Sequence, residues 1–182
     1  MFSKIIDLDS IEITELFEVL YEYFCEDFID NKTYLNSNIY INPRTYKKDK
    51  ETGKEIDFWH LTTRENTYTK KEGKKFIKVK ERLPDYRRSE RLRWIKKIIE
   101  NHTIDDIKLF YHQESNEHKD IRLYLWLEDY DFVVILQKLG KSSSFLVTSF
   151  YIDRDGKREE YLKRYDNYIS KTDESLKDCE WF

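Results

Sequence analysis

Four short runs rich in aromatic and β-branched residues lie between residues 107 and 152, and they constrain the fold more than any other feature of the chain. They span residues 107–112, 121–127, 132–136 and 145–152. Runs of this length and composition are typical of β-strands. The polar connections at 129–131 and 140–144 are short enough for hairpins. We therefore expect an antiparallel meander in this part of the chain.

Helical periodicity flanks this meander. Apolar residues recur at helical spacing from residue 10 to 30 and from 85 to 101, and tyrosines do so from 161 to 168. Asp9 is placed to cap the first helix, with Leu8 packing on Ile13. Further strands are expected at 37–41, 58–63 and 76–80. The predicted fold class is α+β, with an N-terminal helix followed by a small antiparallel β-sheet flanked by helices.

The net charge of −3 conceals a segregation of charge along the chain. Residues 1–43 carry 9 acidic and 2 basic side chains (−7), residues 44–101 carry 10 and 19 (+9), and the remainder carries 17 and 12 (−5). We predict an acidic helical appendage at 1–56 and a core domain at 57–182. The basic segment predicts a surface for a polyanion, although its lysine-rich loops have the alternative of being only solvated.

Several functional classes lack their sequence signals. Cys25 and Cys179 stand far apart and form no CxxC pair, so neither a disulfide framework nor a zinc site is expected. The chain has no glycine-rich phosphate loop and no carboxylate pattern typical of a metal site, so no metal and no cofactor are expected. It also has no apolar run long enough for a membrane span and no signal peptide. We expect a cytoplasmic protein with no membrane partner.

His60 is the strongest candidate for a proton-transfer residue. On the predicted strand 58–63, alternation places His60 and Thr62 on the same face. An imidazole with a pKa near 6.5 exchanges protons at neutral pH, whereas a lone histidine is also commonly structural. The three other histidines lie in or near polar connections, and we expect them at the surface.

Two arginines of the predicted helix 85–101 face inward. Arg88 falls on the apolar stripe of this helix, and Arg91 lies at the edge of the stripe. A guanidinium directed toward a sheet is costly unless a carboxylate or a phosphate meets it. Arg88 and Arg91 are therefore candidates for phosphate binding, and the alternative is a structural ion pair with Glu65 or Glu90.

Four segments carry a family resemblance: WHLTTR at 59–64, RSERLRWI at 88–95, WL followed by DFVVIL within 126–136, and LVTSFY at 146–151. They resemble the Barnase–EndoU–Colicin E5/D–RelE-like nucleases, in the group found in phages and mobile elements. The resemblance covers about residues 57–168. It implies a small antiparallel sheet flanked by helices and RNA cleavage without a metal.

The resemblance also implies roles for individual residues. It implies that His60 is the acid or base and that Thr148 is a hydroxyl contacting the phosphate or the attacking 2′-oxygen. The implied ligands of the scissile phosphate are Arg64, Arg88 and Arg91. The implied substrate-binding residues are Thr62, Trp94, Tyr151, Arg164 and Tyr165.

Two functions follow as hypotheses. The first is a metal-independent endoribonuclease, a toxin or phage–host conflict effector, that cleaves tRNA, mRNA or ribosome-bound RNA to a 2′,3′-cyclic phosphate and has an antitoxin or immunity protein as a candidate partner. The alternative is a non-catalytic RNA-binding or inhibitory protein of a phage or mobile element. The nuclease hypothesis requires the His60 imidazole and the Arg88 guanidinium to converge on one phosphodiester.

Overall fold

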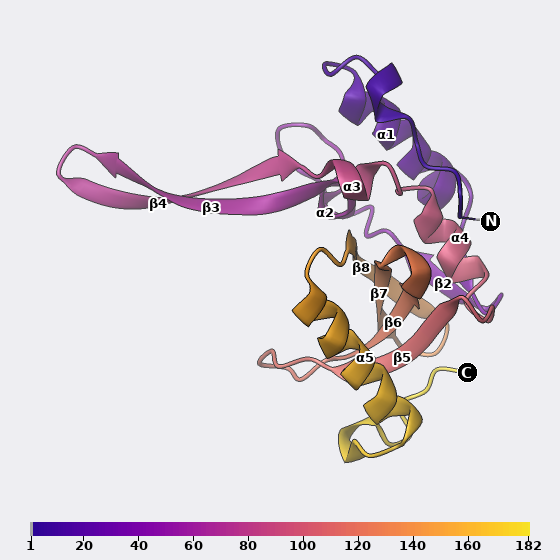
Figure 1. Cartoon of the computed structure of the whole chain (residues 1–182). Helices are drawn as coiled ribbons and strands as arrows, with labels where there is room; N and C mark the ends of the chain where they lie inside the picture. The colour runs from indigo at the N-terminus through magenta and orange to yellow at the C-terminus, as the bar shows by residue number, and fades with distance from the viewer. Residues whose placement is uncertain (1) are drawn as a thin grey trace.

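Six strands form one curved sheet in the computed structural model, which describes residues 2–182 (Figure 1). The sheet order is β1 (Tyr34–Leu35), β2 (Ile39–Asn42), β8 (Ser143–Tyr151), β7 (Phe132–Leu139), β6 (Ile121–Leu127) and β5 (Ile107–Gln113). Strands β5 to β8 form the predicted antiparallel meander, and β2 pairs in parallel with β8. The α+β class is confirmed, but the sheet is larger than the small sheet expected.

Both predicted hairpins of the meander are present. A 3-10 turn at Glu128–Tyr130 joins β6 to β7 and is followed by Asp131 with φ of 48°. Aspartate is one of the few non-glycine residues that adopt this left-handed conformation readily. Gly140, with φ of 63°, lies in the turn between β7 and β8. The residues at both turns are therefore suited to the backbone that the meander requires.

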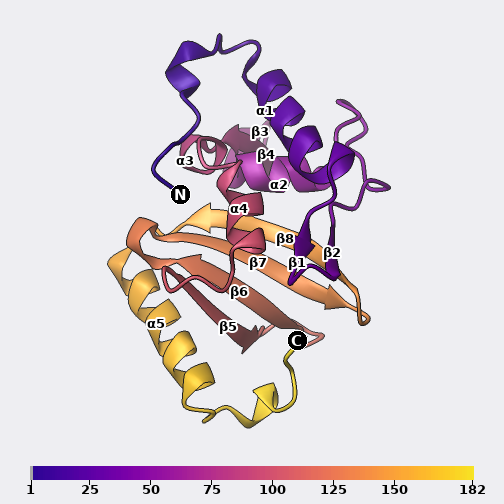
Figure 2. The same ribbon diagram turned by 90° about the vertical axis from the view of Figure 1, so that its right-hand side faces the viewer.

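The two faces of the sheet bury separate apolar clusters, because successive side chains of a strand alternate between faces. Leu125 and its partner Val134 belong to one cluster, and Tyr124 and its partner Ile135 belong to the other. Figure 2 shows α4 and α5 on opposite sides of the sheet. The helices are α1 (Leu16–Phe24), α2 (Ile56–Thr62), α3 (Tyr86–Ser89), α4 (Trp94–Glu100) and α5 (Asp155–Ile169). None of those described is long and apolar enough to cross a membrane.

The N-terminal segment shares the main apolar cluster with the rest of the chain. Phe24 of α1 packs on Phe58 of α2, with ring centroids 5.7 Å apart. Ile41 of β2 lies in the same cluster, and β2 extends the meander by pairing with β8. Side chains on both sides of the boundary predicted at residue 56 therefore belong to one apolar cluster.

Residues 56–62 form helix α2, so the strand predicted at 58–63 is wrong for most of its length. Phe58 and Leu61 lie three positions apart and are both buried on one face of the helix. The Thr62 hydroxyl donates to the carbonyl oxygen of Phe58 at 2.9 Å, a bond typical of threonine in a helix. A run of seven residues rich in aromatic and β-branched side chains suits either structure, and burial against α1 decides for the helix.

Two predicted helices differ from the structure in extent. The helix expected at 85–101 is divided into α3 and α4 by a turn, although its predicted stripe of Leu92, Ile95 and Ile99 is fully buried. The first helix begins at Leu16 rather than at residue 10, and Ile13 is 66% exposed instead of packing on Leu8. It continues into a π-helical segment at Cys25–Asp30. The start of α1 coincides with the buried Leu16 and not with the capping pattern around Asp9.

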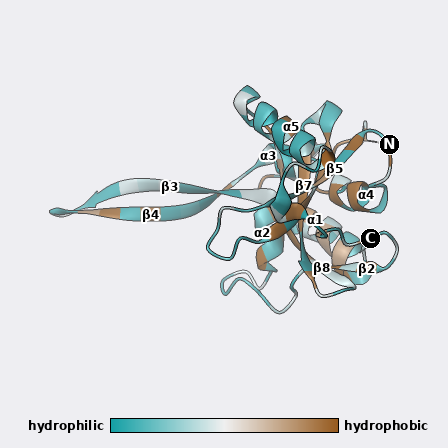
Figure 3. Cartoon of the chain, turned by 90° about the horizontal axis from the view of Figure 1, so that it is seen from below, coloured by the Kyte–Doolittle hydropathy of each residue, from teal (hydrophilic) through white to brown (hydrophobic). Residues whose placement is uncertain are grey.

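Strands β3 (Thr63–Glu72) and β4 (Lys75–Pro84) form a separate two-stranded hairpin that extends away from the rest of the protein (Figure 1). We call residues 63–84 the arm. The strand predicted at 76–80 lies within β4, whereas β3 was not predicted beyond residue 63. In the hydropathy colouring of Figure 3 the arm is mainly hydrophilic. Residues 64–84 contribute no side chain to either apolar cluster of the described chain.

Candidate functional site

The base of the arm borders a cleft of about 1040 Å³. The cleft lies where the arm meets α3, the last residues of β8 and the start of α5. Its lining residues are Arg64, Pro84, Asp85, Tyr86, Arg87, Arg88, Phe150, Tyr151, Ile152, Asp153, Arg154 and Lys157. Segments from three distant parts of the sequence therefore build one concave surface.

Positive charge dominates this cleft. Its lining includes four arginines and one lysine but only two carboxylates, Asp85 and Asp153, which gives a formal charge of +3. Arg64 and Arg87 are exposed and take part in no ion pair among the described residues. Cations concentrated in a concave surface raise the local concentration of anionic ligands. The two unpaired guanidiniums are the groups most available to such a ligand.

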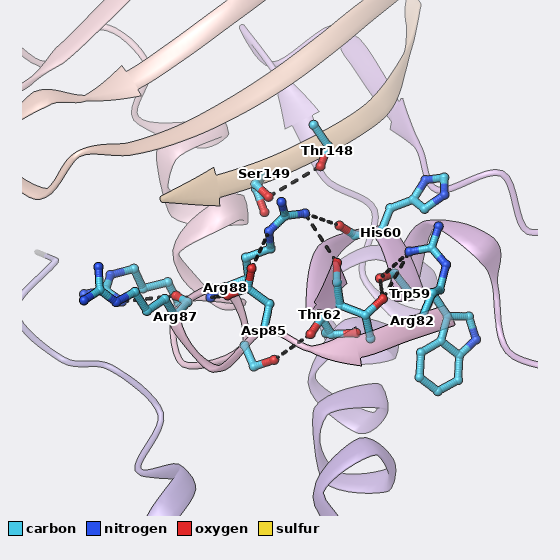
Figure 4. Close-up of polar contacts among 12 residues, drawn as sticks. Trp59, His60, Thr62, Arg82, Asp85, Arg87, Arg88, Thr148 and Ser149 are labelled. Carbon is cyan, nitrogen blue, oxygen red and sulfur yellow. Dashed lines mark hydrogen bonds and ion pairs between the residues drawn. The ribbon is translucent and has the colours of Figure 1, made fainter. Parts of the chain in front are cut away.

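Arg88 is held by protein groups on several sides (Figure 4). Its Nε lies 3.1 Å from Oδ2 of Asp85, the residue that also caps α3. Its Nη1 donates to the carbonyl oxygens of His60 at 3.0 Å and of Thr63 at 3.4 Å. Burial lowers the pKa of Arg88 in spite of the Asp85 carboxylate. The guanidinium therefore connects α3 to the end of α2, and its ion pair is with Asp85 rather than with Glu65 or Glu90.

The His60 side chain lies beside the cleft and does not line it. In Figure 4 the carbonyl of His60 faces Arg88, and the imidazole extends away from it. Burial, followed by the charges of Arg82, Arg44 and Arg88, lowers the pKa of the imidazole to about 4. The ring is therefore neutral at physiological pH, so it can accept a proton but lacks the second, acidic proton of an imidazolium.

A buried ion pair anchors helix α2 beside His60. Nε of Arg44 donates to both carboxylate oxygens of Asp57, at 3.0 and 2.9 Å. Asp57 is only 1% exposed. This contact ties the loop after β2 to the first turn of α2, so it fixes the element from which the imidazole extends.

Arginines of α3 and the following turn stack on Tyr151 at the end of β8. The guanidinium of Arg87 lies 4.7 Å from the centre of the Tyr151 ring, and that of Arg91 lies 5.6 Å from it. Arg91 also forms an ion pair with Glu90, while Arg87 keeps its donors free. Arg87 could not be selected from the sequence, because a continuous helix would place it off the inward stripe of Arg88.

The structure brings together only part of the predicted site. Arg64, Arg88 and Tyr151 line the cleft, with His60 and Arg91 beside it. Thr148 lies in β8, where its hydroxyl is 3.4 Å from the carbonyl oxygen of Ser149 (Figure 4). The predicted role of each of these residues stays a prediction.

Four other predicted substrate-binding residues lie elsewhere. Thr62 is fully buried, and Trp94 is 2% exposed, with its Nε1 donating to the carbonyl oxygen of Lys4. Both side chains are parts of the protein interior, so neither is accessible to a ligand in this conformation. Arg164 and Tyr165 lie on α5, on the far face of the sheet, where Arg164 forms an ion pair with Glu160. These positions could not be recognised without knowing which face α5 covers.

Residues 2–182 also form a hollow outside this cleft. This smaller hollow of about 370 Å³ lies between residues 167 and 180 and contains none of the predicted site residues. No group of three or more histidine, cysteine or acidic side chains is arranged to hold a metal ion within this part of the chain.

Comparisons with known proteins found no matching family model, no matching curated protein and no matching solved structure. The family resemblance of the four sequence segments therefore gains no support from relatives. The geometry of the cleft and its surroundings carries the functional argument.

Proposed function

We propose that the protein binds RNA and holds a single-stranded segment in the basic cleft. The observation that carries this proposal is the lining of the cleft, which contains five cationic side chains and only two carboxylates. Phosphate neutralisation by lysine and arginine supplies most of the sequence-independent affinity of proteins for nucleic acids. Of the two hypotheses drawn from the sequence, non-catalytic RNA binding is the one that this geometry supports best.

Aromatic side chains in the same cleft favour a single strand over a duplex. Tyr86 is 52% exposed, and the half-buried Tyr151 also lines the cleft. Unpaired bases stack on such rings, whereas the bases of a duplex are already stacked on one another. A cleft that offers both rings and cations matches the two chemical parts of a single-stranded nucleotide. An RNA-directed role also agrees with the cytoplasmic location expected from the sequence.

A second candidate function is the metal-independent endoribonuclease. The neutral imidazole of His60 among three arginines favours it, whereas the direction of the imidazole away from the Arg88 guanidinium does not. In that reaction His60 takes the proton of the 2′-hydroxyl, the 2′-oxygen bonds to phosphorus, and the bond to the 5′-oxygen breaks. The 5′-oxygen takes a proton from water, and a 2′,3′-cyclic phosphate remains. A fold and activity of the Barnase–EndoU–Colicin E5/D–RelE-like kind, and an antitoxin or immunity protein as a partner, belong to this second candidate.

Binding is tested with a labelled single-stranded RNA of mixed sequence titrated at several salt concentrations. The variant Arg64→Gln/Arg87→Gln removes the two unpaired guanidiniums, and Lys50→Gln/Lys97→Gln removes two exposed charges elsewhere. The slope of log affinity against log salt should fall by about 1.4 for the cleft variant, since each phosphate contact contributes about 0.7 on a single strand. Equal losses for the two variants would refute binding in the cleft.

Cleavage is tested separately, by incubating the protein with a pool of tRNA and mRNA in EDTA. The second candidate predicts fragments with 2′,3′-cyclic phosphate ends, and His60→Gln should abolish them. Arg88 is unsuitable for this test because it bonds to the backbone of α2 and β3. If the unaltered protein binds RNA but produces no such ends, the nuclease is excluded and the binding function remains.

A further inference from the structure

The arm has two chemically different faces. Cross-strand partners of an antiparallel pair lie on the same face, and successive residues alternate between faces. One face carries Thr67 opposite Lys80 and Thr69 opposite Lys78. We call it the cationic face; its residues are Thr63, Glu65, Thr67, Thr69, Lys71, Phe76, Lys78, Lys80, Arg82 and Pro84. The opposite face carries the aliphatic and tyrosine side chains of the arm, namely Tyr68, Ile77, Val79 and Leu83.

The arm carries a large excess of positive charge. Residues 63–84 contain eight basic and three acidic side chains, so the arm carries +5 (8 − 3) in a protein whose net charge is −3. On the cationic face four basic side chains accompany one carboxylate, Glu65, which forms an exposed ion pair with Lys80. Exposed pairs of this kind contribute little stability, so Lys80 can exchange its partner for a phosphate.

The arm contributes little to the stability of the fold. Its two ten-residue strands reach about 33 Å from the body, at about 3.3 Å per residue. An isolated two-stranded hairpin is only marginally stable in water. Apart from Thr63, the arm buries no side chain in the rest of the described structure. A long hairpin that adds nothing to the core and concentrates positive charge on one face is suited to an extended anionic partner.

We propose that the cationic face of the arm lies along the sugar–phosphate backbone of a double-stranded RNA segment. This inference rests on the proposed RNA-binding function and adds a second contact surface to it. The arm ends at Pro84, which lines the cleft together with the following Asp85, so a duplex on the arm continues into the single strand held there.

The side chains of the cationic face favour a duplex over a single strand. Its only aromatic ring is Phe76, 73% exposed near the tip, so the face offers no series of rings for unpaired bases. Proteins recognise double-stranded RNA mainly through its phosphates and 2′-hydroxyls across the shallow minor groove. The lysines of this face match the phosphates, and the hydroxyls of Thr67 and Thr69 match the 2′-hydroxyls.

A pair of matched variants tests this assignment on a blunt 20-base-pair RNA duplex. Lys78→Gln/Lys80→Gln removes two charges from the cationic face, and Lys70→Gln/Lys75→Gln removes two charges from the opposite face of the same arm. The first variant should bind the duplex about tenfold more weakly at moderate salt. Its slope of log affinity against log salt should be lower by about 1.8, since each duplex phosphate contact contributes about 0.9. The second should change affinity by less than about threefold.

Each outcome decides the proposal. Retained duplex binding by Arg64→Gln/Arg87→Gln, together with the loss in Lys78→Gln/Lys80→Gln, supports the arm as a separate surface. If the protein binds single-stranded RNA but no duplex, the proposal for the arm is wrong and the proposal for the cleft stands. Equal losses of duplex affinity for the two arm variants would show that the cationic face is not the binding face. Equal affinity for a DNA duplex of the same sequence would show that the arm does not select RNA. Failure to bind any RNA overturns both proposals.

Discussion

Arg88 contacts His60 through the backbone, because its Nη1 donates to the His60 carbonyl oxygen at 3.0 Å. The sequence predicted a different relationship, in which the Arg88 guanidinium and the His60 imidazole meet at one phosphate. In the structure the guanidinium holds the C-terminal turn of α2 in place, and the imidazole leaves that helix in another direction (Figure 4). Arg88 is thus both a cleft residue and a structural link.

We predict that Arg88→Met destabilises the protein by about 2–3 kcal/mol, because hydrogen bonds from a charged donor to two carbonyl oxygens are lost in a half-buried site. Methionine keeps the length of the side chain but donates no hydrogen bond. Urea denaturation measures the change in the free energy of unfolding. The neighbouring Arg87→Met serves as the control and should change it by less than about 0.5 kcal/mol, since Arg87 is exposed. Similar values for the two variants would contradict a structural role of Arg88.

We predict that His60 makes the protein less stable as the pH falls from 6.5 toward 4. The unfolded chain takes up a proton near pH 6.5, whereas the folded imidazole stays neutral until its lowered pKa of about 4. Over that range the unfolded state binds more protons, so the free energy of unfolding decreases with decreasing pH. In His60→Gln this contribution disappears, and the stability curve becomes flatter between pH 6.5 and 4.

Urea denaturation at a series of pH values checks this expectation. His118→Gln, in an exposed loop, is the matched control and should follow the curve of the unaltered protein. A steeper or unchanged slope for His60→Gln would show that the imidazole is not held in its neutral form.

The meander could be predicted because each of its strands is bounded by turn residues and buries apolar side chains. The helix α2 could not, because the segment around Trp59 and Thr63 is rich in residues that favour strands in isolation. Contacts with α1, such as Phe24 on Phe58, override that local preference. Strand β3 was missed for the opposite reason: its threonines and lysines show no apolar periodicity.

Sequence reasoning selected some residues that line the cleft and others that lie in the protein interior. Arg88 was selected because it falls on the apolar stripe of its predicted helix, and Arg64 was implied by the family resemblance; both line the cleft. Trp94 was assigned to the substrate because tryptophan suits both a base-stacking surface and a core, and the sequence does not show which side of the helix is covered. Lys157 was missed because α5 reaches the cleft only through the tertiary fold.

We predict that Tyr151→Ala weakens single-stranded RNA binding by about 1–3 kcal/mol, the range found when a ring that stacks on a base is removed. Tyr151→Phe keeps the ring and should bind almost as tightly as the unaltered protein. Fluorescence anisotropy with a short labelled RNA measures both affinities. Because Tyr151 is half-buried, the unfolding curve of each variant is recorded as well. Equal affinities for the alanine and phenylalanine variants would exclude stacking on this ring.

We predict that Arg44→Met destabilises the protein by about 3–5 kcal/mol, because it leaves the buried carboxylate of Asp57 without its cation. Replacing both partners, as in Arg44→Met/Asp57→Leu, removes the unpaired charge and should recover most of this loss. Lys80→Met breaks the exposed pair with Glu65 and should cost less than about 1 kcal/mol. Thermal and urea unfolding give the three values. A single variant no more destabilising than Lys80→Met would show that this ion pair does not hold α2, and His60 with it, in place.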